Sequence, residues 1–241
     1  MKKTLYIYLF VISSVLQAQS FGQNKVQYRD FEWSFISSPN FDVYYYGDDL
    51  DLATFTMEAA NEAYEQIGKH LRWTLKKRVP ILVYHSHNEF QQNNAVGVYM
   101  SEGIGGVTEL FKNRVVIPFE GDYKAFRHVI HHELVHAMIN DLIYGGRMNN
   151  VASGQVRWSI PLWANEGLAE YLSSNWDTEA DMIIRDLAIN ERIPTVKELE
   201  YFLAYKGGQS VWKFIAEKYG REKIGEVFQA VSYTHLTLPT N

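Results

Sequence analysis

The 241-residue sequence contains no cysteine. Disulfide bonds, thiolate metal sites and cysteine nucleophiles are therefore excluded. A metal site in this chain would have to use other ligands, which its 8 histidines and 28 acidic residues can supply.

Basic residues are fewer than acidic residues. The chain has 23 Lys and Arg against 28 Asp and Glu, for a formal net charge of −5. A nucleic-acid partner normally requires a basic face, so we expect none. The hydrophobic content of 46% is ample for a core. Roughly 220 residues after removal of a leader suit one domain of two lobes.

No apolar run reaches the roughly 20 residues needed to span a bilayer. A shorter run, residues 5–15, follows the basic head at residues 1–3. This layout is typical of a secretory signal peptide. We expect residues 1–18 to be removed by cleavage after Ala18, with Gly22 as a second cleavage site and an uncleaved anchor as the alternative. The mature chain would lack a transmembrane span and be exported, as a periplasmic, outer-envelope-associated or secreted protein.

The pattern H-E-x-x-H begins at His132 and ends at His136. On a helix these two side chains lie one turn apart on the same face, so both can hold one metal ion with Glu133 beside them. The flanking sequence predicts such a helix, because Asp122 can cap its start, apolar residues recur every three or four positions, and Gly145 can end it. A buried helix without metal is the alternative.

A third ligand is available in a second helical stretch, which Pro161 opens. Catalytic zinc needs three protein ligands and one open position, and a carboxylate beside two histidines meets this need. Glu166 is the candidate. A structural zinc site would use four protein ligands, and no fourth ligand is evident near either stretch.

The H-E-x-x-H pattern followed by N-E-G-x-A-E-Y at residues 165–171 resembles the gluzincin metallopeptidases. It is most similar to the bacterial peptidase-MA-like domains, which are distant relatives of thermolysin. The resemblance covers residues 41–231 and implies an α+β fold. In this thermolysin-like zincin, a mixed β-sheet and the metal-binding helix would form an N-terminal lobe, residues 41–145. Residues 160–231 would form a C-terminal α-helical lobe, and residues 19–40 would be an N-terminal lead-in.

The resemblance also implies a mechanism. His132, His136 and Glu166 would bind one Zn²⁺ per chain, and Glu133 would act as general base for zinc-activated water that hydrolyses a peptide or protein substrate. Endopeptidase activity fits better than aminopeptidase activity, because no G-x-M-E-N-like stretch is present. The alternative is a catalytically idle, peptidase-like binding or scaffold domain of a larger envelope protein. Such a domain would be expected to have lost Glu133 or a ligand.

Three further residues take roles from the resemblance. Tyr205 would donate a hydrogen bond to the oxyanion of the transition state. Glu170 lies one turn after Glu166, where related enzymes accept a hydrogen bond from a ligand imidazole. We interpret His128, one turn before His132, as a helix-face or outer-shell residue.

Residues 103–111 and 115–118 predict a β-hairpin. In gluzincins the strand before the metal helix borders the cleft, and its open edge pairs with an extended peptide. The resemblance suggests residues 105–108 or residues 115–117 as that edge, with an ordinary internal hairpin as the alternative. The substrate-binding candidates are Gly105, Gly106 and Val107.

Two other clusters have a metal-binding interpretation beside a simpler one. Asp48, Asp49 and Asp51 could bind calcium, although helix capping explains them more simply. His85 and His87 follow a predicted strand and could share a second metal, although polar residues are common at strand ends.

The other elements follow from periodicity and from turn residues. Strands are expected at 41–46 and 79–84, and helices at 52–71, 178–190, from 194 onward, 210–219 and 222–231. Residues 145–159 predict a surface loop on the rim of the cleft. Residues 232–241 break the helical pattern and resemble translated adapter sequence, so we expect a non-native tail. Related chains often carry a C-terminal β-propeller domain, which would then be missing here.

Overall fold

The computed structural model of the protein describes residues 25–97, 99–144 and 160–237. The predicted signal peptide, the predicted loop at 145–159 and residues 238–241 of the predicted tail lie outside these ranges. No helix within them is both long and apolar enough to cross a lipid bilayer.

A mixed five-stranded sheet in the order β1-β2-β3-β5-β4 forms the centre of the first lobe. Its strands are β1 (Trp33–Ser37), β2 (Phe41–Tyr46), β3 (Val79–Tyr84), β4 (Val107–Glu109) and β5 (Arg114–Pro118). Strands β2, β3 and β5 are parallel, whereas β1 and β4 are antiparallel edge strands. The strands predicted at 41–46 and 79–84 are confirmed. Strand β1 was not predicted, because it is mostly exposed and shows no apolar alternation.

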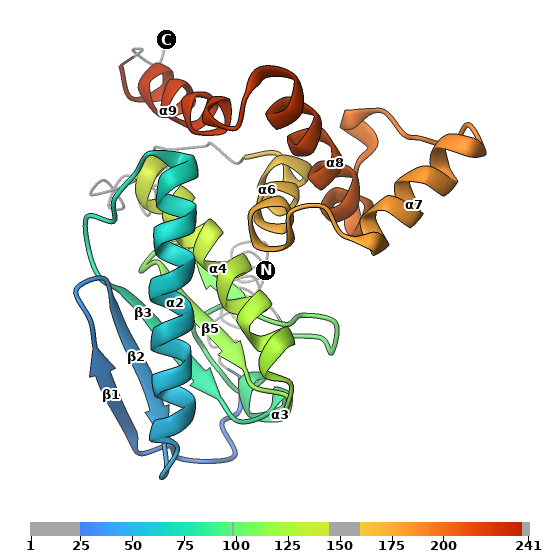
Figure 1. Ribbon diagram of the computed structural model, residues 1–241. Coiled ribbons are helices and arrows are strands. Elements are labelled where there is room, and N and C mark those ends of the chain that lie inside the picture. The colour runs from blue at the N-terminus through green and yellow to red at the C-terminus, as the bar shows by residue number, and fades with distance from the viewer. Residues whose placement is uncertain (1–24, 98, 145–159, 238–241) are drawn as a thin grey trace, which may run out of the picture.

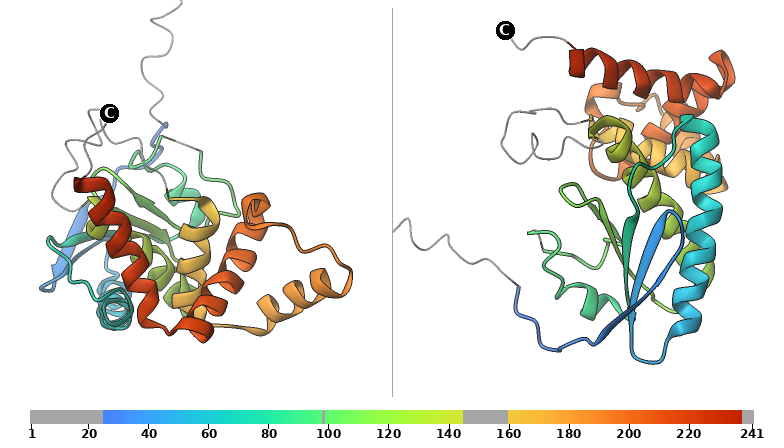
Figure 2. Two further views of the ribbon diagram at one scale, coloured as in Figure 1. Left: turned by 90° about the horizontal axis from the view of Figure 1, so that it is seen from above. Right: turned by 90° about the vertical axis from the view of Figure 1, so that its left-hand side faces the viewer.

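Two long helices cover one face of this sheet. Helices α2 (Leu50–Leu71) and α4 (Tyr123–Tyr144) lie side by side on it, as Figures 1 and 2 show. The short helix α3 (His87–Phe90) lies toward the other face. Fully buried side chains from the helices and the sheet form the core between them, among them Leu52, Ile67, Ile81, Ile117, Ile130 and Leu134. This core holds α4 rigidly against the sheet.

The second lobe is helical. It comprises α6 (Leu162–Ser174), α7 (Thr178–Ile189), the 3-10 turn η1 (Val196–Glu198), α8 (Tyr201–Tyr219) and α9 (Glu222–Thr237). Helix α6 packs closely on α8, while α9 returns to the end of α2, where the Gln229 side chain donates a hydrogen bond to the backbone oxygen of Leu71 at 3.2 Å. The α+β architecture with two lobes agrees with the sequence prediction.

Two helix boundaries differ from the prediction. Helix α8 runs without a break from Tyr201 to Tyr219, so the separate helix predicted at 210–219 is wrong. Helix α9 continues through Thr237, past its predicted end at Val231. The sequence explains the second difference, because no glycine or proline follows Val231 until Pro239.

The predicted hairpin is present, but its strands have different roles. Strand β5 lies between β3 and β4, so both edges of its backbone are paired. The suggestion that residues 115–117 form an open edge is therefore wrong. Strand β4 pairs with β5 alone among the described strands. Gly105 and Gly106 precede β4, and only Val107 of the substrate-binding candidates lies in it.

Candidate metal centre

Helix α4 presents His132 and His136 on one face, and their Nε2 atoms lie 3.2 Å apart. The predicted cap is confirmed, because a side-chain oxygen of Asp122 accepts hydrogen bonds from the backbone nitrogens of Lys124 and Ala125. Both histidines are buried at 9% exposure. They point away from the sheet, toward the helical lobe.

Helix α6 brings the carboxylate of Glu166 to the same point. Its Oε2 atom lies 3.2 Å from Nε2 of His132 and 3.3 Å from Nε2 of His136. Metal–ligand bonds of about 2.0–2.1 Å in a tetrahedral zinc site place any two ligand atoms about 3.3 Å apart. The three donor atoms therefore already have the mutual spacing that a tetrahedral zinc ion requires.

The charge balance of the site also fits a divalent cation. The acidic side chains of Glu133, Glu166 and Glu170 surround the site, and the nearby cation Lys206 is shared between Glu170, Asp177 and Glu179. Burial lowers the pKa of His132, but the neighbouring carboxylates outweigh burial and raise it to about 10. Burial alone would raise the pKa of Glu166. Its contacts with the two histidines have the larger effect and hold that pKa well below its ordinary value.

Each ligand imidazole has an outer partner at its other nitrogen. Nδ1 of His132 lies 3.1 Å from Oε1 of Glu170, and Nδ1 of His136 lies 3.2 Å from Oδ1 of Asn165. A proton on each Nδ1 leaves the Nε2 lone pairs free to face a metal. The structure thus brings Glu170 to the predicted place. Asn165 was missed, and its position directly before Glu166 was the only sequence signal for it.

Glu133 lies at the floor of the same site. The hydroxyl of Thr108, on β4, lies 2.7 Å from Oε2 of Glu133 and 2.9 Å from its backbone oxygen. A Cβ atom at Gly106 would lie 2.9 Å from Cγ of Glu133 and 3.0 Å from Cγ2 of Ile117. Gly106 therefore makes room for Glu133, which is a different role from the substrate contact predicted for it. Thr108 has no local sequence signal and was missed.

Tyr205 reaches the site from α8. Its ring stacks on that of His132, with centroids 6.0 Å apart and planes at 17°. Burial and then the negative charge of Glu166 raise the pKa of Tyr205 well above its usual value. The phenol therefore stays protonated at neutral pH and can donate a hydrogen bond.

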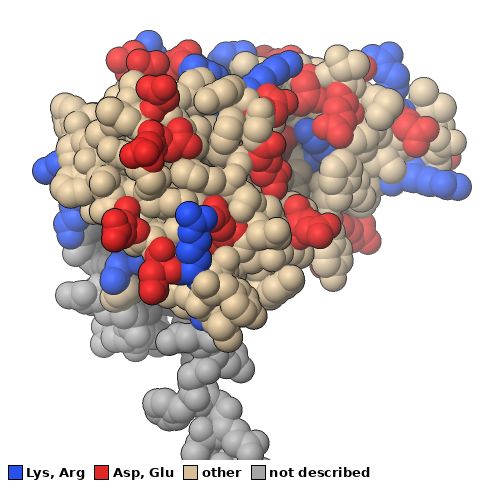
Figure 3. Space-filling view, turned by 90° about the horizontal axis from the view of Figure 1, so that it is seen from below, with Lys and Arg blue, Asp and Glu red and all other residues tan. Residues whose placement is uncertain are grey.

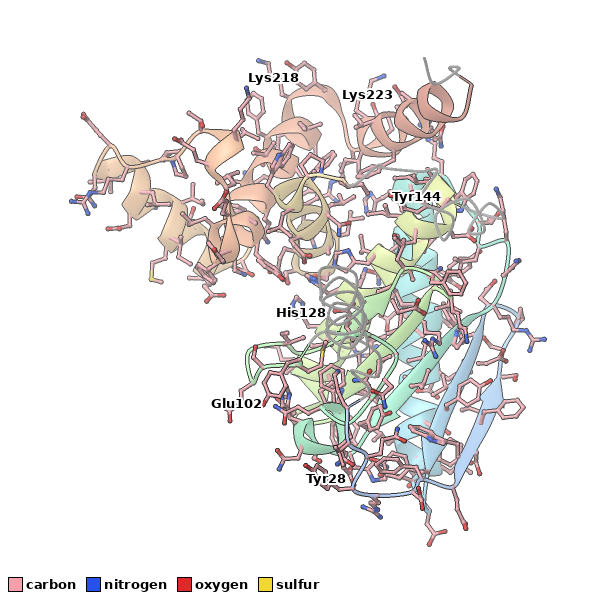
Figure 4. All side chains as sticks on the ribbon, turned by 180° about the vertical axis from the view of Figure 1, so that it is seen from behind. Tyr28, Glu102, His128, Tyr144, Lys218 and Lys223 are labelled. Atoms are coloured by element: carbon pink, nitrogen blue, oxygen red, sulfur yellow. The ribbon has the colours of Figure 1, made fainter. Side chains whose placement is uncertain are left out.

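A cleft passes over these residues in two parts, of about 450 and 340 Å³. The two parts share Gly106, His132, Glu133 and Tyr205. One part reaches His128 and the other Tyr144, which are labelled near opposite ends of α4 in Figure 4. Figure 3 shows that the molecule is hollowed between its lobes, with acidic side chains around the hollow. The predicted site residues therefore lie in the middle of an open cleft.

His128 does not join the three donor atoms. Its Nε2 lies 3.5 Å from Oε1 of Glu170, and these two residues with His132 make a second group of close donor atoms. The ammonium of Lys206 lies 2.9 Å from the same carboxylate, which disfavours a metal ion there. His128 is therefore an outer-shell neighbour of the first group, in agreement with its predicted role.

The two other metal-binding interpretations, at Asp48, Asp49 and Asp51 and at His85 and His87, are not supported by a group of close donor atoms among the described residues. Within the described ranges, close groups of donor atoms form around His132 alone, and neither Asp48, Asp49 and Asp51 nor His85 and His87 form one. His85 and His87 instead lie 3.4 Å from carboxylate oxygens of Asp49 and Glu120 respectively.

Comparison with known proteins identifies the family of the chain. No curated protein and no solved structure matches the sequence significantly. The family model described as the peptidase MA superfamily matches residues 59–237, which include the C-terminal part of α2, the sheet from β3 onward, both motif helices and α9. A match over most of the chain, with the H-E-x-x-H helix and the Glu166 helix inside it, assigns the family: the chain belongs to the peptidase MA superfamily.

Proposed function

We propose that this chain is an exported, zinc-dependent metallopeptidase that cleaves within peptide or protein chains. The observation that carries the proposal is the convergence of His132, His136 and Glu166, at zinc-ligand spacing, beside the carboxylate of Glu133. The family supports a peptidase in general. The metal, the reaction and the residue roles below are our proposal, and export rests on the pattern of residues 1–18.

Each residue of the site would have its own role in the reaction. A zinc ion held by the three ligands would act as a Lewis acid that polarises the peptide carbonyl and makes water nucleophilic at neutral pH. Glu133 would accept a proton from the attacking water and then return it to the leaving amine. Thr108 would hold the Glu133 carboxylate in place through the short contact between them. The neutral phenol of Tyr205 would donate a hydrogen bond to the developing oxyanion.

The cleft supports internal cleavage. One part is lined by His128 and the other by Tyr144, which lie on either side of Glu133 along α4, so a substrate chain can continue on both sides of the bond that is cut. Val107 lies on the edge strand β4, whose backbone can pair with an extended peptide. Backbone pairing of this kind gives affinity with little sequence selectivity, which suits an endopeptidase of broad specificity.

The metal assignment predicts one zinc per chain. Glu166→Ala and His136→Ala should each weaken zinc binding severely, because three protein ligands are the minimum for a stable catalytic site. Metal analysis after reconstitution and dialysis measures this. Glu226→Ala is the matched control, since Glu226 forms a surface pair with Lys223 on α9. A wild-type protein without zinc after reconstitution would contradict the proposal.

A second test separates metal binding from chemistry. Glu133→Gln should bind zinc and melt like the wild type but lose at least about a hundredfold in kcat, because an amide cannot accept the proton of water. Hydrolysis of a library of denatured proteins, with and without added zinc, supplies the assay. Full activity of this variant would remove Glu133 from the mechanism. Zinc binding by a wild type that hydrolyses nothing in the library would instead favour the idle binding domain.

A further inference from the structure

Lys206, on α8, is a buried cation close to the metal centre. Its side chain is 8% exposed, and its Nζ atom lies 2.9 Å from Oε2 of Glu170. Carboxylate oxygens of Glu179 and Asp177 lie 3.3 and 3.6 Å from the same nitrogen. Burying a lysine is costly unless it is paired, so this ion cluster differs in kind from a surface salt bridge. Lys213, two turns later on α8, pairs with Glu217 on the surface and lies over the ring of Trp176, away from the carboxylates that surround Lys206.

The two oxygens of Glu170 serve different partners. Oε2 accepts from Lys206, which leaves Oε1 to face Nδ1 of His132 at 3.1 Å. Glu170 borders the open cleft, and Nε2 of His128 is a competing partner for Oε1 at 3.5 Å. The bond from Lys206 therefore restricts the rotation of the carboxylate. It also supplies a positive charge beside Glu170.

A purely structural role for Lys206 is the simpler alternative. Helices α6 and α8 are already fixed to each other in other ways, however. Gly208 lies directly against the α6 backbone, and the Trp212 indole donates a hydrogen bond to the backbone oxygen of Ala164 at 2.9 Å. The packing of the two helices thus does not depend on a buried ammonium. The position of Lys206 is better explained by the carboxylate that it holds.

We propose that Lys206 is a positioning residue for the zinc ligand His132 and acts on it through Glu170. The inference rests on the proposed zinc-dependent function. It extends that function by a third layer: His132 faces the metal, Glu170 orients His132, and Lys206 orients Glu170. In this arrangement Lys206 sets the affinity of the site for zinc without contacting the metal.

A double-mutant cycle tests this order of action. Zinc dissociation constants are measured by competition with a chelator for the wild type, Glu170→Gln, Lys206→Met and the double variant. Loss of an outer partner of a metal ligand typically lowers affinity about 10–100-fold, so each single variant should bind zinc at least about tenfold more weakly. In the double variant, Lys206→Met should add almost nothing to the effect of Glu170→Gln, because its target is already altered.

Three comparisons make the result decisive. Lys213→Met, the same change on the same helix, should leave zinc affinity unchanged, whereas Lys206→Arg should retain most of it because the cation remains. Lys206→Gln replaces Lys206→Met if the latter does not fold, as judged by thermal melting. Unchanged zinc affinity after loss of the Lys206 cation, or additive effects in the double variant, would overturn the inference. Absence of zinc binding in the wild type would instead overturn the proposed function.

Discussion

At the scale of single residues, Glu133 is surrounded by groups that fix its position. The hydroxyl of Thr108 contacts the Glu133 carboxylate. A side chain at position 106 would overlap with Glu133, so only glycine fits there. His132 directly precedes Glu133 on α4. A general base must be held within hydrogen-bond distance of the proton that it removes. The neighbours of Glu133 should therefore influence the rate even where they contact neither metal nor substrate.

Thr108→Val tests this influence. The change keeps the shape of the side chain but removes the hydroxyl, so it should lower kcat about tenfold, the equivalent of roughly 1.4 kcal/mol for a hydrogen bond to a charged group. Zinc affinity should not change. Thr56→Val is the matched control, because Thr56 is buried in α2 and its hydroxyl bonds to Leu52. Equal kcat in the two variants would show that Thr108 does not position Glu133.

The sequence predicted those residues of the candidate metal site that local spacing encodes. His132 and His136 are one helical turn apart, and Glu166 stands in a second recognisable pattern. Thr108 and Lys206 lie on other elements, and only the tertiary structure brings them to the site. No periodicity in the sequence could have pointed to either of them.

At the scale of secondary-structure elements, the contact between α6 and α8 decides whether Tyr205 and Lys206 reach the site. A Cβ atom at Gly208 would lie 2.1 Å from the backbone oxygen of Trp163 and 2.8 Å from Cα of Gly167. Backbone atoms cannot move aside without separating the helices. The two glycines therefore set the distance between α6, which carries Glu166, and α8.

Gly208→Ala should destabilise the protein by about 3 kcal/mol, the upper part of the range for overpacking, and should also weaken zinc binding. Gly207→Ala is a close control, because its Cβ would overlap only with the side chain of Leu199, which can rotate away. Alanine also has the higher helix propensity, which offsets part of that strain. Chemical denaturation measures both effects. Equal stability of the two variants would mean that the helices can separate at little cost.

The same glycines explain why α8 was predicted in two pieces. In a sequence, Gly207 and Gly208 indicate a break, because glycine is unfavourable inside a helix. In the structure, close packing against α6 requires Gly208, whereas Gly207 faces the side chain of Leu199. Strand β1 was missed for a different reason. Pairing with β2 holds it in the sheet, and its own sequence has little apolar pattern. Strongly periodic elements such as α2 were predicted well.

At the scale of the whole molecule, α9 joins the helical lobe to the first lobe. A Cβ atom at Gly225 would lie 2.7 Å from the backbone oxygen of His70, and Ile224 and Phe228 are almost completely buried. The ring of Phe228 also stacks on that of Trp212 in α8, with centroids 5.5 Å apart. Helix α9 thus contacts α2 on one side and α8 on the other.

Truncation tests this joining role. A chain ending at Gly220 loses Ile224 and Phe228 and should be less stable by about 4 kcal/mol, on the scale of burying two such side chains. A chain ending at Val231 keeps both and should melt close to the full-length chain, as expected if residues 232–241 are a non-native tail. Thermal melting compares the three proteins. If the chain ending at Val231 melts as early as the shorter one, the tail is a structural element.

The contact between Gln229 and Leu71 spans 158 positions of the sequence, and it has a consequence for folding. The sheet, α2 and α4 can assemble from residues 33–144 alone, whereas α9 can dock only once residues 222–237 are available. Bringing Gln229 to Leu71 closes a long loop and lowers the conformational entropy of the chain. The contacts of α9 offset this cost only when that helix docks. The helix that carries Glu166 is secured through α8 and α9, so the ligand set would be completed last. A folding chain would then remain inactive until α9 is in place.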